Sequence, residues 1–310
     1  MPFLPLGGQA VIEGVMMRSP TQVAVAVRRP DGSLGYLERR FESITRRIKL
    51  LGLPVVRGAV SLFETMSLGI TALNFSADEA ARDDKTGEAE KPNFWMNALQ
   101  YVIVGVSLAL GVLFFVVLPA KLTGWLGFQD RWRFGLVDGG FRLLAFVSYL
   151  WLMSQWKDMA RVLGYHGAEH KAIHALEAGA PLTPESVQSF PRLHPRCGTT
   201  FLFLVVMVSI VVFTFIGKPA NIAQHLLRVA CMPLIAGVAF EFIRLSGKHF
   251  DKPFVKLLAW PGMQFQRLTT REPDLDMCAV AIASLQKVLD DPAIEAARRA
   301  GGMKEVSFVQ

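Results

Sequence analysis

The sequence predicts a mainly α-helical, polytopic membrane protein with about four transmembrane helices, a small N-terminal β-hairpin region and cytoplasmic helical segments. Hydrophobic residues make up 52% of the 310 residues, and the mean hydropathy is +0.34. Such a composition is unlike that of an ordinary soluble domain. Four apolar runs are long enough to cross a bilayer, and they cover residues 97–120, 134–156, 199–217 and 222–245.

Two of the four runs carry charges. The second contains Asp138 and Arg142, and the fourth contains His225, Arg228 and Glu241. Ionisable side chains are costly inside a bilayer, so each is expected to have a partner or a function.

The N-terminal residues 1–52 are expected to form a cytoplasmic loop and a β-hairpin. Residues 7–18 mix glycines with one acid, one amide and one base, which favours an irregular loop. Residues 22–28 and 34–39 are strand-like runs on either side of a Pro-Asp-Gly-Ser turn, which predicts a hairpin.

The next segment, 53–75, is apolar but is interrupted by Pro54, Arg57 and Glu64. It is too polar for a regular transmembrane span and predicts an amphipathic or re-entrant helix.

The remaining segments outside the spans are polar. Residues 76–96 are expected to form a charged linker, and an apolar stripe over 276–289 predicts an amphipathic helix near the C-terminus. The expected organisation is therefore an N-terminal region at 1–52, a helix at 53–75, a linker at 76–96, two spans within 97–156, a loop at 157–198, two spans within 199–245 and a C-terminal segment at 246–310.

The distribution of lysine and arginine predicts the orientation. Of the 33 basic residues, 27 lie in residues 1–97, 157–198 and 244–310, and four lie in the two loops between the first and second spans and between the third and fourth spans. The positive-inside rule then places both termini and the loop 157–198 in the cytoplasm of a multi-pass inner-membrane protein. The net charge of +7 is explained by this orientation, so no nucleic acid is expected as a partner. The bilayer is the expected partner, and the sequence carries no signal of oligomeric state.

The loop 157–198 holds the densest group of chemically active side chains. If residues 165–177 are helical, His166, Glu169, His170, His174 and Glu177 share one face. The first three have the form H-x-x-E-H, in which two histidines one turn apart bind a metal ion and the glutamate polarises water as a general base. The alternative is a polar helix face that is merely solvated.

A second cluster precedes the third span. His194 and Cys197 are three residues apart, and Pro195 keeps His194 out of helical geometry. Imidazole and thiolate together suit a soft divalent ion, so we expect His166, His170, His194 and Cys197 to bind a divalent metal, with zinc the best fit. The alternative is a structural turn in which the cysteine packs as a small apolar residue.

Three further residues could support such a site. His174 and Glu177 are expected to orient the ligands. Glu241 is either a distant third ligand, as in zinc peptidases of the inverted-motif type, or the ion-pair partner of Arg244 three residues later.

Charged residues near the clusters could contact a substrate. Lys171 is expected either to meet an anionic small molecule or lipid head group, or to be an ordinary interfacial lysine. Glu13 and Arg18 are either substrate contacts or a salt bridge that locks the glycine-containing loop.

Four motifs in the same order resemble the YqhQ family of bacterial membrane proteins, a family of unknown function described as predicted metal-dependent enzymes. The motifs lie at 7–18, 166–171, 194–199 and 269–273, so the resemblance extends over nearly the whole chain. It implies an integral membrane location and a metal site, and it supplies no reaction. The motif residues that it implies as functional are Glu13, Arg18, His166, Glu169, His170, His194, Cys197 and Glu272.

The leading functional prediction is a membrane-embedded metal-dependent enzyme that faces the cytoplasm, best explained as a zinc hydrolase with Glu169 as its general base. A closed set of four ligands would instead indicate a structural metal. The alternative is therefore a non-catalytic membrane scaffold or regulator with a structural metal site or none. A transporter is a third class, and it is disfavoured because the first and third spans offer few polar residues to line a path.

Overall fold

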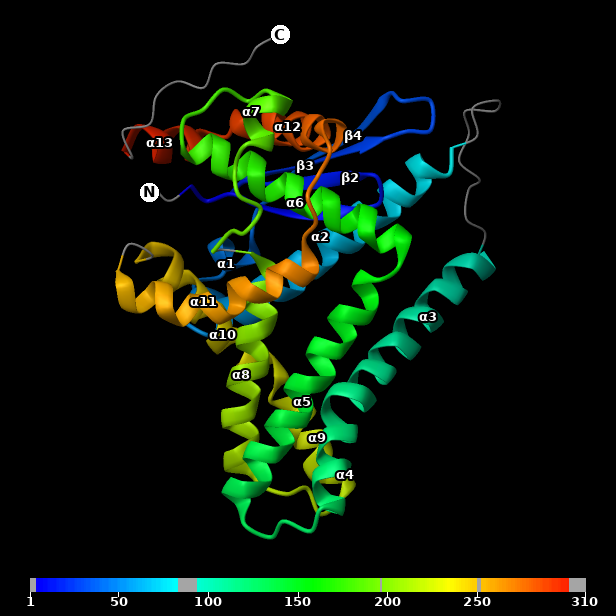
Figure 1. The fold of residues 1–310 in the computed structure, drawn as a ribbon, viewed down its shortest axis with the longest axis vertical. Helices are drawn as coiled ribbons and strands as arrows, with labels where there is room; N and C mark the ends of the chain where they lie inside the picture. Colours follow the sequence, from blue (N-terminus) through cyan, green and yellow to red (C-terminus); the bar gives the residue numbers. More distant parts are fainter. Residues whose placement is uncertain (1–3, 83–93, 196, 250–251, 301–310) are drawn as a thin grey trace.

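A computed structural model describes residues 4–82, 94–195, 197–249 and 252–300 of the chain (Figure 1). The fold is mainly helical, as predicted, and it has two parts. A bundle of long helices forms one part, and a β-sheet covered by helices forms a cap at one end of the bundle. The short loops 126–130 and 217–221 lie at the opposite end.

The four predicted spans are confirmed as helices long and apolar enough to cross a membrane. They cover Val102–Trp125, Arg131–Ser154, Gly198–Ile216 and Ile222–Ser246. The first span is built from α3 (Phe94–Val112), a π-helical turn (Leu113–Val117) and α4 (Leu118–Trp125). The others are α5 (Arg131–Ser154), α8 (Gly198–Ile216), and α9 (Ile222–Ala230) followed by α10 (Met232–Lys248).

Small residues allow α5 and α8 to approach each other closely. A Cβ atom at Gly135 would lie 2.1 Å from Thr214 Oγ1, and one at Gly139 would lie 2.7 Å from Ile210 Cγ2. Membrane helices lack a strong hydrophobic drive to associate, so close packing at small residues is a main source of their stability.

Three charged residues of the second and fourth spans bind one another. Asp138 Oδ2 accepts hydrogen bonds from Arg142 Nη2 at 3.0 Å and from Arg228 Nη1 at 3.2 Å. Arg228 Nη2 also donates to the carbonyl of Gly217 at 2.7 Å. All three side chains are buried, so the charges are paired inside the bundle rather than exposed to lipid.

The N-terminal region forms a four-stranded antiparallel sheet, in the order β1 (Gly7–Val11), β2 (Gly14–Arg18), β3 (Gln22–Arg28) and β4 (Leu34–Arg40). The predicted hairpin is β3 and β4, in which Val25 pairs with Leu37.

The expectation of an irregular loop at 7–18 was wrong, because these residues form the hairpin of β1 and β2, with Gly8 opposite Met17. Strand β2 is buried on both faces, so it lacks the polar alternation by which a half-buried strand is recognised. Glu13, with φ at 51°, occupies a turn position that glycine usually takes, which removed the turn signal from the sequence.

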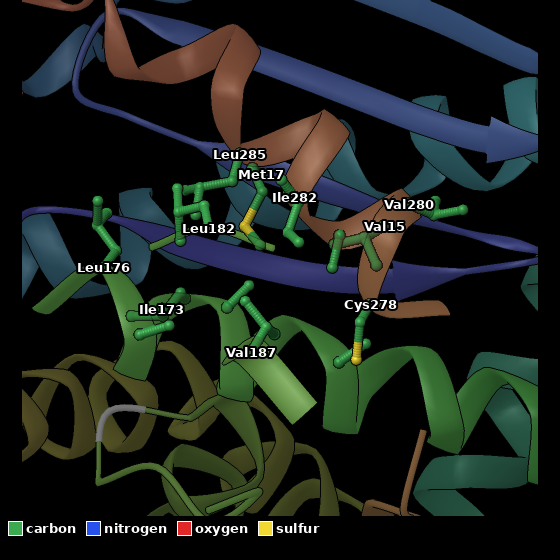
Figure 2. Close-up of a cluster of buried hydrophobic side chains, with 14 of the residues drawn as sticks. Val15, Met17, Ile173, Leu176, Leu182, Val187, Cys278, Val280, Ile282 and Leu285 are labelled. Carbon is green, nitrogen blue, oxygen red and sulfur yellow. The ribbon is translucent and has the colours of Figure 1, made fainter. Parts of the chain in front are cut away.

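Each face of the sheet is covered by helices. Side chains such as Val15 and Met17 pack against α6 (Lys157–Glu177), α7 (Pro184–Gln188) and α12 (Leu275–Leu289), as Figure 2 shows. The opposite face, with Val25 and Val27, packs against α2 (Val56–Ala80). Three short elements remain. Helix α1 (Ile44–Arg47) and a 3-10 turn (Lys49–Gly52) connect β4 to α2, and α13 (Pro292–Ala300) follows α12. The sheet therefore holds α6 and its histidines from one side.

Helices extend into both ends of the expected linker 76–96. Helix α2 continues to Ala80 and α3 begins at Phe94, so residues 76–80 and 94–96 are helical. The linker residues 83–93 and the tail 301–310 lie outside the described residues. Helix α2 is not among the candidate spans found in the described ranges, and it also packs on α10, where a Cβ at Gly58 would lie 2.9 Å from Gly237 Cα.

Candidate metal centre

The predicted histidine helix is α6, and the face that carries its polar stripe points into the protein. Glu169, His170 and Glu177 are all buried. Gly167 allows the helix to approach the segment that precedes α12, because a Cβ there would lie 2.1 Å from the carbonyl oxygen of Arg271. The helix is thus fixed between the sheet and the C-terminal segment.

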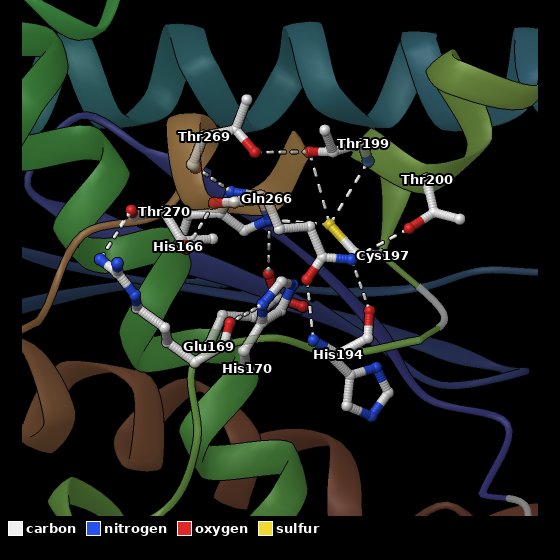
Figure 3. A network of polar contacts seen from close by, with 11 residues as sticks. His166, Glu169, His170, His194, Cys197, Thr199, Thr200, Gln266, Thr269 and Thr270 are labelled. Atoms are coloured by element: carbon white, nitrogen blue, oxygen red, sulfur yellow. Dashed lines mark hydrogen bonds and ion pairs between the residues drawn. The ribbon is translucent and has the colours of Figure 1, made fainter. Parts of the chain in front are cut away.

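The first group of converging side chains consists of His166, His170 and Cys197. One ligand atom from each of the three lies within 4.8 Å of the others. His166 Nε2 is 3.2 Å from Cys197 Sγ, and the two imidazole centroids are 4.5 Å apart. Figure 3 shows the three side chains directed toward one another. After small shifts of the side chains, the three ligand atoms would be close enough to bind one metal ion.

Backbone carbonyls fix the orientation of both imidazoles. His166 Nδ1 is 2.7 Å from the carbonyl oxygen of Thr269, and His170 Nδ1 is 2.5 Å from that of Arg192. Each Nδ1 therefore donates to its carbonyl, so Nε2 is the ring nitrogen that each histidine would offer to a metal ion, once His166 Nε2 has lost any proton it carries. His170 Nε2 is buried and makes no hydrogen bond within the described part of the chain. Metal-binding histidines show the same support from a carbonyl, so the residues fit a metal ion.

The thiol of Cys197 is held in a form that binds metal. Cys197 is the N-cap residue of α8, and its Sγ accepts a hydrogen bond from the backbone N–H of Thr199 at 3.3 Å. Burial raises the pKa of the thiol, but the charges of His166 and His170 outweigh burial and hold the pKa well below its usual range. The thiolate is the nucleophilic and metal-binding form of cysteine.

The Cys197 thiolate in turn raises the pKa of His166. Burial lowers the pKa of this imidazole, but the neighbouring Cys197 thiolate opposes burial, and the net result is a pKa of about 9. Without a metal ion the two groups form an imidazolium–thiolate pair, and a divalent ion would replace the proton between them.

Glu169 adjoins the group without belonging to it. Its Oε2 lies 3.8 Å from His166 Nε2, and burial raises the pKa of its carboxyl group. A cavity of about 70 Å³ opens beside these side chains, which is room for about two water molecules. Its lining comprises Leu6, Gly7, Gly8, His166, Glu169, His170, Ile173, His194, Cys197 and Gly198.

A second group consists of His174, Glu177 and His194, whose ligand atoms also lie within 4.8 Å of one another. Sequence reasoning expected His194 to join His166, His170 and Cys197. In the structure the His194 ring is 5.7 Å from that of His170 and 4.6 Å from that of His174. The expected ligands are therefore divided between two neighbouring groups.

The structure pairs Glu241 with a residue that the sequence did not suggest. Its carboxylate accepts hydrogen bonds from Arg57 Nε at 2.7 Å and Arg57 Nη2 at 2.5 Å. Glu241 belongs to neither group of candidate ligands in the described ranges, and it forms its ion pair with Arg57 of α2.

The two ionisable residues of the β1–β2 hairpin are also held by other segments. Glu13 accepts two hydrogen bonds from Arg161 of α6, each at 2.5 Å. Arg18 lies with its guanidinium 4.0 Å from the centroid of Phe41 and donates to Thr65 Oγ1 at 3.2 Å. A salt bridge does lock the hairpin, but it joins Glu13 to α6.

Lys171 and Glu272 bind each other. Lys171 Nζ lies 2.5 Å from Glu272 Oε1 and donates to the carbonyl of Gln188 at 2.7 Å. Lys171 is buried, although the sequence suggested a residue at the membrane surface or at a substrate. The pair joins α6 to the segment before α12.

Sequence reasoning missed the residues that position the two groups. Gln266, fully buried in α11 (Pro253–Thr269), donates to the carbonyl of His194 and accepts from its N–H at 2.8 Å. Thr269 supplies the carbonyl for His166, and its hydroxyl lies 2.9 Å from that of Thr199. The sequence feature that could have indicated them is the spacing of Gln266 and Thr269, which lie about one helical turn apart in an amphipathic segment.

Gly8 is a further residue that the sequence reasoning did not single out. A Cβ there would lie 2.6 Å from Glu169 Oε1. We expect Gly8→Ala to destabilise the protein by about 1–3 kcal/mol, because the buried carboxylate must move. Thermal unfolding of the detergent-solubilised protein measures the change. Gly7→Ala is the matched control, since a Cβ at Gly7 meets nothing within 4 Å; equal stability of the two variants would contradict the prediction.

Fold and site together define a multi-pass membrane protein with a buried His/Cys/Glu site that could hold a metal ion. The chain belongs to the family of proteins of unknown function DUF1385, whose model matches residues 53–291. It is 32% identical over 294 residues to the uncharacterized protein YqhQ of Bacillus subtilis (strain 168), which covers 91% of this chain and 92% of that protein. The resemblance to the YqhQ family is thereby confirmed. No solved structure matches the chain.

Proposed function

We propose that the protein is a membrane-embedded, metal-dependent hydrolase whose zinc site faces the cytoplasm. The observation that carries the proposal is the convergence of His166, His170 and Cys197 beside the buried carboxylate of Glu169 and a cavity of about 70 Å³. Three protein ligands leave one position of a tetrahedral ion open, which is typical of catalytic zinc sites.

The side chains have distinct roles in this proposal. His166, His170 and Cys197 would hold the ion, which as a Lewis acid would polarise a carbonyl or phosphoryl oxygen of the substrate. Glu169 would accept the proton of the attacking water. Its pKa is raised by burial, and a general base works best when its pKa approaches the working pH.

The orientation of the site in the membrane follows from charge. The cap and the loop 157–198 lie at the same end of the bundle (Figure 1). Residues 1–97, 157–198 and 244–310 of the sequence hold 27 of the 33 basic residues, so from the positive-inside rule we infer that these segments, and both termini, lie in the cytoplasm of an inner-membrane protein.

The substrate proposed is an amphiphile with an anionic head group. The cavity at the site is too small for a whole substrate, but a groove of about 410 Å³ lies between α8, α10 and α11. Its walls are mainly apolar, with Phe203, Phe242 and Leu258 among them, and it includes His249 and Lys252. An acyl chain suits such walls, and a lysine suits a lipid phosphate or carboxylate.

The groove is also linked to the site. Thr200 lines it and accepts a hydrogen bond from Gln266 at 2.9 Å, and Gln266 holds the backbone of His194. A substrate in the groove would therefore lie next to residues that support the site.

Glu169→Gln tests the hydrolase. The variant keeps the shape of the side chain and removes the base, so we expect it to retain its metal content and to lose activity by about 100- to 10,000-fold. Mass spectrometry of the metal and rescue of a strain that lacks the gene are the two measurements. Glu185→Gln, at an exposed glutamate of α7, is the control. Full rescue by Glu169→Gln would rule out its role as the base.

One observation favours a structural metal in a membrane scaffold. The first group of ligands joins α6 to the N-terminus of α8, and the carbonyls of Arg192 and Thr269 tie in two further segments. In a scaffold, Glu169→Gln would keep both metal and rescue, whereas Cys197→Ala would lose the ion of the first group together with rescue.

A further inference from the structure

The second group of side chains is a compact site in its own right. His174 and Glu177 lie three residues apart in the last turns of α6, and His194 comes from the loop before α8. Glu177 and His194 are buried, and His174 is half-buried. Two imidazoles and a carboxylate from two segments are a common ligand set for a divalent cation.

The distances within this group match ligands of one ion better than a hydrogen bond. His194 Nε2 lies 3.6 Å from Glu177 Oε2, which exceeds the usual hydrogen-bond length of about 2.7–3.2 Å. Two ligands of one tetrahedral zinc ion, at bond lengths of about 2.0–2.2 Å, lie about 3.3–3.6 Å apart. A distance of 3.6 Å is therefore one that two ligands of a single ion would adopt.

The loop before α8 sets opposite tautomers on the two histidines that it touches. His170 Nδ1 faces the carbonyl of Arg192, while His174 Nε2 faces the carbonyl of Leu193 at 3.0 Å. Since each of these nitrogens donates, the lone pair lies on Nε2 of His170 and on Nδ1 of His174. Two adjacent carbonyls thus assign His170 to the first group and His174 to the second, each in the manner of a metal ligand.

We infer that His174, Glu177 and His194 bind a second divalent cation, so that the protein holds two ions side by side in one centre. His194 also lines the cavity beside His166, Glu169, His170 and Cys197, so the two sites share one space. The second ion would also fix the loop whose carbonyls orient His170 and His174. The inference does not depend on catalysis at the first group.

The two sites differ in their chemistry. The first offers a thiolate and two imidazoles, and the second offers a carboxylate and two imidazoles with no sulfur. Thiolate selects soft ions, whereas carboxylate and imidazole also accept Mn²⁺ and Fe²⁺. The difference gives each site a separate spectroscopic signature, because only the first site can show thiolate-to-cobalt charge transfer.

Cobalt loading of the purified full-length protein tests the inference. We expect two Co²⁺ per wild-type chain after removal of excess ion, with a charge-transfer band in the near ultraviolet. Glu177→Gln and His174→Ala should each bind one ion and keep the band, which also shows that they are folded. Cys197→Ala should bind one ion without the band. His249→Ala, at an exposed histidine outside both groups, should bind two.

The outcomes that would reject the second site differ from those that would reject the first. One Co²⁺ per wild-type chain with the band present would overturn the second site and leave the first intact. Two ions in wild type, and two again in both Glu177→Gln and His174→Ala, would also overturn it. A wild-type protein without the band would instead contradict the first site.

Discussion

Replacing Cys197 with alanine should weaken zinc binding at the first site by more than about 100-fold. Residues that only support a ligand cost about 10- to 100-fold in metal affinity, and a ligand that supplies a negative charge is worth more. The burial of the site adds to the effect, since His166 and His170 would then face a divalent ion without the thiolate that balances its charge. Competition with a chromophoric chelator on the solubilised protein measures the affinity.

Cys278 provides the control for this experiment. Cys278 is as fully buried as Cys197, but it lies in the core of the cap and outside both groups of candidate ligands. Cys278→Ala should bind zinc with wild-type affinity, although it leaves a small cavity. Equal zinc affinity in wild type, Cys197→Ala and Cys278→Ala would show that the thiol is not a ligand.

Asp138→Ala should destabilise the bundle by about 3–5 kcal/mol. The substitution removes the carboxylate that binds Arg142 and Arg228 and leaves two cations buried in the span region. Breaking a buried ion pair from one side costs this much because the remaining charge has no compensation. Unfolding in mixed detergent micelles, followed by circular dichroism, measures the loss.

Asp130→Ala is the matched control for the membrane-buried aspartate. Asp130 caps the N-terminus of α5, where its Oδ2 accepts from the N–H groups of Trp132 and Arg133. It is exposed, so its loss should cost about 0.5–2 kcal/mol, as for other N-caps. If Asp138→Ala is no more destabilising than Asp130→Ala, the buried triad does not stabilise the bundle.

The parts of the fold that could be predicted are those that depend on residues close together in the sequence. The four spans are recognisable because a bilayer requires about 20 consecutive apolar residues. The hairpin of β3 and β4 has a turn between two strand-like runs. Helix α6 could be identified because the histidines and glutamates recur at helical spacing, and that spacing depends only on neighbours in the chain.

Partners distant in the sequence were not predictable. The expected partner of Glu241 was three residues away, but the structure brings Arg57 from α2. The expected partner of Glu13 lay in its own loop, but Arg161 comes from α6. In both cases a pair of nearby residues fitted the sequence equally well. Only the tertiary packing selects the distant partner, between the sheet and α6 for Glu13 and between α2 and α10 for Glu241.

The sequence by itself determined the class of the protein, the helix that carries the histidines, and the residue types from which a metal site can be built. The tertiary structure decided how those residues are grouped. His194 lies with His174 and Glu177, and Cys197 lies with His166 and His170. Two adjacent carbonyls of one loop orient His170 and His174, and Gln266 holds the backbone of His194. Helical periodicity places side chains on a face, but it cannot fix the position of a loop that is set by contacts with α6 and α11.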